Sequence, residues 1–277
     1  MTGMPARGGR GRRALVLAAA LVAVGTAAAA MSGCVARPGD DDARQVEEWI
    51  EQQEWVLSAT SSTSDDPWSA SASFITQLDP AIPDDDLERL ATEAERRADG
   101  KGWPAVYLTW ELGDDRSFSN LGGAATLDVF LALRDEASFE TFTARGANEC
   151  SAYCATIDAE SPAGLLAAVE RMRATAEEVG GVQRNLGFTA TDPGSTFWVT
   201  AELDAPVDEA VAVWESLVAA GTVSIKSARA WVVEPVGDLP PDQLLDVTVA
   251  DEASRIAAEQ LAAGQSAVEV RVSVAEG

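Results

Sequence analysis

The chain has 277 residues, 47% of them hydrophobic, which is enough for one large or two small globular domains. It carries 20 basic and 45 acidic residues, and a formal charge of −25 argues against binding to nucleic acid or to anionic lipid headgroups. It contains no histidine, which excludes histidine-based catalytic triads, histidine metal ligands and histidine proton shuttles.

The first 33 residues have the order of an export signal. Four arginines are followed by a run of Ala, Leu and Val from Ala14 to about Met31. A basic segment before such a run is typical of a secretory signal peptide, and its charge orients the following chain outward. A run of about 18 apolar residues also approaches the length of a membrane-spanning helix, so length alone does not separate a cleaved signal from a retained anchor.

The tetrapeptide Met31-Ser32-Gly33-Cys34 resembles the lipobox of bacterial lipoproteins, in which small residues precede a lipidated cysteine. Ser32 and Gly33 fit that pattern, whereas Met31 departs from the usual Leu, Val or Ile. The resemblance implies that residues 1–33 are a signal peptide, that Cys34 carries the lipid, and that the protein is held on the outer face of the cell membrane. Several acyl chains give stable anchoring where one is marginal. The alternative is an uncleaved helix in which Cys34 is incidental.

Residues 34–42 contain Pro, Gly and three Asp, which predicts a lipidated acidic tether. Without residues 1–33 and their four arginines, 16 basic residues face 45 acidic ones, a charge of −29. We expect these acids to keep the folded body clear of anionic headgroups.

Residues 43–158 are predicted to form a first α+β unit. A helix at 43–54 places Val46, Trp49 and Ile50 on one face. In chain order we then expect strands at 55–62 and 68–78, a helix from Pro83 that Gly100 and Gly102 end, strands at 106–110 and 127–133, and a helix at about 136–145. Asp84, Asp85 and Asp86 are interpreted as the acidic first turn of the second helix rather than as a cation site.

Residues 161–277 are predicted to form a second, similar unit. The expected elements are a helix from Ser161-Pro162, strands at 182–190 and 196–203, a helix from Pro206, strands at 223–234 and 244–249, a helix at 251–263 and a last strand through Val268 and Val274.

Short matches between the halves support a duplication. Leu-Asp-Val followed by Asp-Glu-Ala-Ser occurs from Leu127 and again from Leu245, and Leu-Asp before a proline-started helix occurs at Leu78 and Leu203. We therefore expect an α+β fold of two units, each an antiparallel sheet with helices on one face. Each unit is ferredoxin-like (βαββαβ) with an added N-terminal helix and strand. The alternative is convergent patterning in an alanine-rich chain.

Cys150 and Cys154 remain once Cys34 is assigned to lipid, and an even pair in an exported chain predicts a disulfide. Bridged Cα atoms lie about 4.4–6.8 Å apart, so we expect the segment to bend rather than to run straight. The alternative is two separate thiols.

The sequence contains no phosphate-binding loop, no dinucleotide-binding turn and no nucleophile elbow. We expect no cofactor and no metal. The weak candidates for acid/base chemistry are Glu111, Asp114 and Asp115 beside Trp110. Other tryptophans are predicted to pack in the core or at sheet edges rather than to form a sugar-binding platform: Trp68, Trp103 and Trp231.

We therefore expect a non-enzymatic, membrane-anchored extracytoplasmic lipoprotein that binds or scaffolds an envelope protein or a small ligand. The alternative is a cell-envelope hydrolase that uses a carboxylate pair. A groove lined by converging carboxylates and aromatic residues would favour the hydrolase.

Overall fold

The computed structural model describes residues 39–66, 70–121, 123–145, 152–179, 187–233, 242–265 and 267–275. The chain divides into two compact units, residues 1–37 and 38–277, and the second contains all the described residues. Its helices are α2 (Asp40–Glu51), α3 (Asp84–Asp99), α4 (Ala124–Leu133), α5 (Pro162–Glu178), α6 (Asp208–Ala219) and α7 (Glu252–Ala262). Its strands are β1 (Val56–Ser64), β2 (Ser71–Leu78), β3 (Ala105–Leu112), β4 (Arg116–Ser119), β5 (Thr141–Ala144), β6 (Tyr153–Thr156), β7 (Gly187–Thr191), β8 (Phe197–Glu202), β9 (Ile225–Val233), β10 (Asp242–Val249) and β11 (Val268–Val274).

The elements form a short repeat of one helix and two strands. The described helices begin at residues 40, 84, 124, 162, 208 and 252, at intervals of 44, 40, 38, 46 and 44 residues. Each of α2 to α6 is followed by two strands, whereas α7 is followed by β11 alone within the described residues.

All eleven described strands lie in one mixed sheet in the order in which they occur in the chain. The two strands of each repeat pair antiparallel, and the pairs across each helix, such as β2 with β3 and β6 with β7, are parallel. Every crossover helix therefore joins strands that are direct neighbours. A split βαβ unit leaves a strand between them, so the two antiparallel, ferredoxin-like sheets that we predicted are not seen.

The duplication in the sequence corresponds to three of these short repeats. The start of α2 lies 122 residues before that of α5, α3 lies 124 before α6, and α4 lies 128 before α7. Leu78-Asp79 and Leu203-Asp204 occupy equivalent places after β2 and β8. The predicted boundary near residues 158–161 falls between β6 and α5, while the sheet continues from Tyr153 on β6 to Phe188 on β7.

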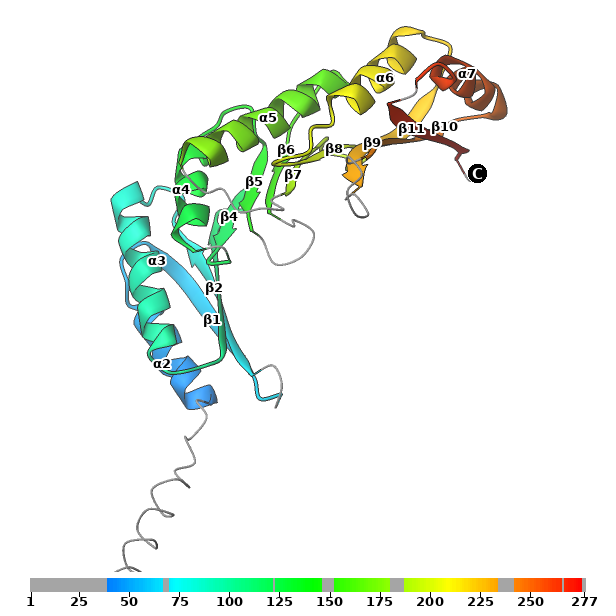
Figure 1. Ribbon diagram of the computed structural model, residues 1–277. Coiled ribbons are helices and arrows are strands. Elements are labelled where there is room, and N and C mark those ends of the chain that lie inside the picture. The colour runs from blue at the N-terminus through cyan, green and yellow to red at the C-terminus, as the bar shows by residue number, and fades with distance from the viewer. Residues whose placement is uncertain are drawn as a thin grey trace, which may run out of the picture. The chain divides into compact units, whose positions relative to one another are not determined.

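The core lies between the helices and one face of the sheet, as Figure 1 shows by the row of helices along that face. Large buried side chains occupy neighbouring register positions, for example Phe74 beside Leu108, and Tyr153 beside Phe188. Because cross-strand partners point to the same side of a sheet, these pairs place the buried side chains on the helix-covered face. The other face carries mostly polar side chains.

Two elements of the first half differ from our predictions. Residues 127–133, predicted as a strand, belong to α4, because Leu127, Phe130 and Leu133 form a buried stripe at helical spacing. The predicted helix at 136–145 is instead a loop followed by β5, whose Phe142 and Ala144 alternate inward. The Leu-Asp-Val match therefore pairs a helix with β10 and has no structural counterpart. The other helices, and the strands in the described residues at 56–64, 71–78, 105–112, 197–202, 225–233, 242–249 and 268–274, confirm the predicted elements.

Candidate functional site

A pocket of about 490 Å³ lies between α2 and α3. It is lined by Trp49 from the last turn of α2, by Trp55 from the turn before β1, and by Asp86, Arg89 and Glu93 from α3. We call this site the tryptophan pocket. Its volume falls within the range of about 300–1,000 Å³ that small-molecule sites occupy.

Trp55 has a backbone conformation that suits glycine. Its φ is +73°, the left-handed region, which costs an L-residue about 1–2 kcal/mol. The conformation turns the chain from α2 into β1, and the Trp55 carbonyl accepts a hydrogen bond of 2.8 Å from the Asp79 amide. A glycine would make this turn without the cost. The Trp55 side chain is partly buried and packs against the hydrophobic core as well as lining the pocket.

The rim of the tryptophan pocket combines hydrogen-bond donors and acceptors. Arg89 pairs with Asp86 at 2.5 Å, and Glu93 pairs with Arg96 and Arg97. The hydrogen bond from Arg96 holds the pKa of Glu93 below its ordinary value. The Arg97 guanidinium lies 4.3 Å from the centre of the Trp49 ring. Aromatic walls with carboxylates and a guanidinium are suited to a polyhydroxyl ligand, whose ring stacks while its hydroxyl groups donate and accept.

Our sequence analysis missed this pocket. It assigned Trp49 to the apolar face of the first helix and Trp55 to the following strand. The sequence does contain one signal of the unusual turn. Gly or Asn is common where a helix ends, but neither residue stands between residues 51 and 56.

The face of the sheet opposite the helices carries a ladder of hydroxyl groups. Ser117 and Thr143 lie 3.0 Å apart, Thr141 donates to Thr156 at 2.9 Å, and similar pairs continue to β8. Since these hydroxyls bond to one another in register, they stabilise neighbouring strands. Ser117, Thr141 and Thr143 also line a hollow of about 270 Å³ beside the β3–β4 turn.

A second aromatic cluster occupies the same face at β8 to β10. The Arg229 guanidinium lies 5.5 Å from the Trp198 ring and 4.7 Å from the Trp231 ring. Asp246 stands between Arg229 and Arg271 in the register, and its buried Oδ1 accepts no hydrogen bond among the described residues. Burial raises the pKa of Asp246 above its ordinary value, although the two arginines oppose the shift.

The carboxylates that we singled out do lie close together. Glu111, Asp114 and Asp115 line a hollow of about 270 Å³ at the β3–β4 turn. Glu111 accepts a hydrogen bond from Gln77, and Asp115 pairs with Arg116 at 3.3 Å. Trp110, predicted to lie beside them, is fully buried in the core on the other face of β3. The hollow therefore lacks the aromatic wall that a glycosidase groove would offer.

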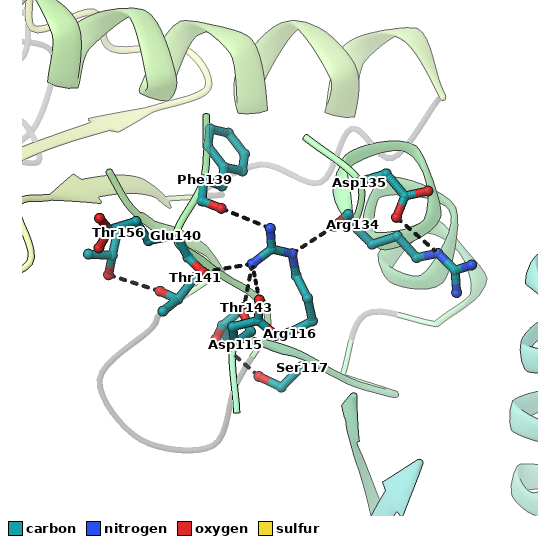
Figure 2. A network of polar contacts seen from close by, with 10 residues as sticks. All are labelled: Asp115, Arg116, Ser117, Arg134, Asp135, Phe139, Glu140, Thr141, Thr143 and Thr156. Carbon is teal, nitrogen blue, oxygen red and sulfur yellow. Dashed lines mark hydrogen bonds and ion pairs between the residues drawn. The ribbon is translucent and has the colours of Figure 1, made fainter. Parts of the chain in front are cut away.

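Arg116 itself holds the adjoining loop together. Figure 2 shows its guanidinium among four main-chain carbonyls, which accept hydrogen bonds at 2.7 Å (Arg134), 2.8 Å (Phe139), 2.9 Å (Glu140) and 3.1 Å (Asp115). Its side chain is 14% exposed. These bonds satisfy the carbonyls at the end of α4 and before β5, so the network supports the fold.

An apolar pocket of about 290 Å³ lies between α5 and α6, with Leu165, Trp214 and Val218 in its wall. Burial opposes ionisation of the adjacent Asp192, but hydrogen bonds from Phe197, Thr196 and Gly194 hold its pKa below the ordinary value. Both carboxylate oxygens are thereby used in the β7–β8 turn. This pocket therefore has an apolar wall, and the carboxylate of Asp192 at its edge is already used within the turn.

The cysteines and remaining tryptophans are placed as follows. Cys154 lies on β6 and takes part in a disulfide, while Cys150 and Cys34 lie outside the described residues, so the Cys150–Cys154 pairing and the lipidation stay predictions. Trp103 packs in the core, 6.1 Å from Phe74, as predicted. Trp68 lies outside the described residues.

Among the described residues, no group of three or more Cys, Asp or Glu is arranged to hold a metal ion. In the same part of the chain, no helix combines the length and the apolar character needed to span a bilayer. Comparison with protein-family models, curated proteins and solved structures finds no match to this chain.

Proposed function

We propose that this protein is a lipid-anchored, extracytoplasmic, non-enzymatic binding protein, and that the tryptophan pocket binds a sugar ring of an envelope glycan. The observation that carries the proposal is Trp55, a bulky aromatic residue kept at a φ of +73° in the wall of a pocket of about 490 Å³. A residue that costs stability where glycine would not is retained for its side chain.

The chemistry of the rim supports a neutral polyhydroxyl ligand. Asp86 and Glu93 offer carboxylate oxygens, and Arg89 offers N–H groups, so one sugar ring meets both acceptors and donors. The indole rings of Trp49 and Trp55 line the same pocket and would supply apolar contacts to its C–H groups.

The same rim supports binding over hydrolysis. Asp86 and Glu93 are each paired with arginine side chains. Hydrolysis of a glycosidic bond needs one carboxylic acid with a raised pKa as the proton donor. The pKa of Glu93 is shifted in the opposite direction.

The N-terminal sequence supports a position close to the membrane. If Cys34 carries lipid, Asp40, the first residue of α2, follows it by six positions in the chain. An extended chain of that length reaches about 20 Å. The tryptophan pocket, built on α2 and α3, would then stand near the membrane surface, among the glycans closest to it.

The anchor is tested by intact-mass analysis of the protein extracted from bacterial membranes. The expected result is a chain that begins at Cys34 and carries added acyl mass. Recovery of an unmodified Cys34 with residues 1–33 still attached would reject this part of the proposal.

The sugar site is tested by co-sedimentation of the purified protein with isolated cell-wall glycan. We expect Trp55→Ala to abolish the sedimented fraction and Trp198→Ala to leave it unchanged. Trp198 is the matched control because it also lies near an arginine guanidinium, but on the opposite face of the sheet. Equal losses in the two variants, or no sedimentation of the wild type, would overturn the assignment.

A further inference from the structure

The last repeat of the described structure lacks a second strand. In the five preceding repeats, the strand after the helix pairs with an antiparallel neighbour on its far side. β11 follows α7 and pairs only with β10, in parallel. One edge of β11 therefore has no strand beside it in the described part of the chain.

The backbone of this edge is ready for pairing. The Ala275 amide donates to the Val249 carbonyl, so residues at odd positions direct their N–H groups toward β10. Because these directions alternate along a strand, Val270 and Val272 direct their N–H and C=O groups to the open edge. The seven residues of β11 contain no Pro and no bulge, which are two of the devices that blunt sheet edges. Its two charged residues, Glu269 and Arg271, pair with each other at 2.7 Å. The edge at β1 does have a bulge, between Val56 and Ser58.

The helix above β11 also leaves the missing position uncovered. α6 and α7 begin 44 residues apart, so Ala210 corresponds to Ser254 and Leu217 to Leu261. The first pair is buried in both repeats, whereas Leu217 is 0% exposed and Leu261 is 43% exposed. α6 contacts both strands of its repeat, whereas α7 contacts β11 and has no second strand of its own repeat to contact in the described part of the chain.

We propose that β11 is a strand-addition site for an extended segment of another protein, antiparallel to β11, with aliphatic residues alternating with lysine or arginine. The aliphatic side chains would lie on the helix-covered side, beside Val270 and Val272 and beneath Leu261. The basic side chains would lie on the other face, which carries Glu269 and its ion-pair partner Arg271.

Charge complementarity selects this occupant. The body is strongly acidic, at 16 basic against 45 acidic residues without residues 1–33, so it attracts a basic segment. The same charge makes two copies of the chain repel one another, which disfavours pairing of β11 with its own copy. This inference is independent of the sugar site, which lies on α2 and α3.

The test uses a fluorescent peptide, Val-Lys-Val-Thr-Val-Lys-Val, and the anisotropy change on titration with the full chain. We expect saturable binding that weakens as salt is added. The peptide with Glu in place of Lys should bind about tenfold more weakly or not at all. N-methylation of the valines, whose N–H groups would face β11, should abolish binding, while N-methylation of the Lys and Thr residues should not.

Two protein variants locate the site. Leu261→Asp should weaken peptide binding about tenfold or more, and Ile256→Asp should not. Ile256 is the matched control, because it is 45% exposed on the same helix and corresponds to the exposed Ala212 of α6. The proposal would be overturned if the peptide does not bind, or if N-methylation of the valines and of the Lys and Thr residues has the same effect. Equal effects of Leu261→Asp and Ile256→Asp would also overturn it. A dimer in sedimentation that Leu261→Asp dissociates would assign the edge to a second copy instead.

Discussion

Replacement of Arg116 by methionine tests whether one guanidinium holds the loop between α4 and β5. The change removes three hydrogen bonds of 2.7–2.9 Å to main-chain carbonyls, and a fourth of 3.1 Å to the carbonyl of its neighbour Asp115, while keeping an unbranched apolar stem. A hydrogen bond contributes about 1 kcal/mol net, and more when one partner is charged. Because the side chain is only 14% exposed, water replaces few of the lost donors. We therefore expect the free energy of unfolding to fall by about 3 kcal/mol.

Urea unfolding followed by circular dichroism measures this loss. A loss of about 3 kcal/mol is large against the 5–15 kcal/mol typical of a domain. Arg89→Met serves as the control, because Arg89 forms an exposed ion pair with Asp86 that contributes about 0–1 kcal/mol. If Arg116→Met and Arg89→Met have the same effect, the three carbonyls are satisfied by water, and the reasoning from the network in Figure 2 fails.

Three further predictions follow from the repeat, the strained turn and the buried carboxylate. Leu217→Ala should lower the free energy of unfolding by about 2–5 kcal/mol, and the equivalent Leu261→Ala by less than about 1 kcal/mol, because only Leu217 is buried. Equal losses in urea unfolding would refute the alignment of α6 with α7. Trp55→Gly should be roughly 0.5–1 kcal/mol more stable than Trp55→Ala, since only glycine adopts a φ of +73° without cost, and the reverse order in thermal melts would contradict the strain. Burial raises the pKa of folded Asp246, so its contribution to stability is complete below its unfolded pKa, about 3.9, and is lost as the pH rises through the folded value. Asp246→Asn should therefore be more stable than the wild type at pH 7, and the difference should vanish below about pH 4. A variant that is less stable than the wild type at pH 7 would show that the attraction of Arg229 and Arg271 for the Asp246 carboxylate outweighs the cost of its burial.

Helix starts and alternating strands were predictable because their causes are local. Pro83 with three following aspartates, and Pro162 after Ser161, each precede a helix of the structure. Alternation of small or branched apolar residues with polar ones located β8 and β11 for the same reason. Such signals depend on the few residues around each element, and they needed no knowledge of the rest of the chain.

Short apolar segments were not predictable in this way. Residues 127–133 place Leu or Val at every second position, but Leu127, Phe130 and Leu133 also fit helical spacing. A segment that packs against β4 and β5 on one side and α5 on another is apolar nearly all round, so its period carries little information. β5 and β6, of four residues each, are too short to show a period at all.

The sequence by itself determined the acidity of the body, the absence of histidine chemistry, most helix starts and the alternation of the longer strands, because each depends on composition or on neighbouring residues. The tertiary structure decided that each half of the apparent duplication spans three shorter repeats of a helix and its strands. Only strand pairing shows this, because it reveals that each helix joins adjacent strands. It also decided the site, since Trp49 and Trp55 lie at the end of one helix and Asp86 and Arg89 in another, 31 or more residues later. No local pattern links such residues, and the packing of α2 against α3 brings them into one pocket.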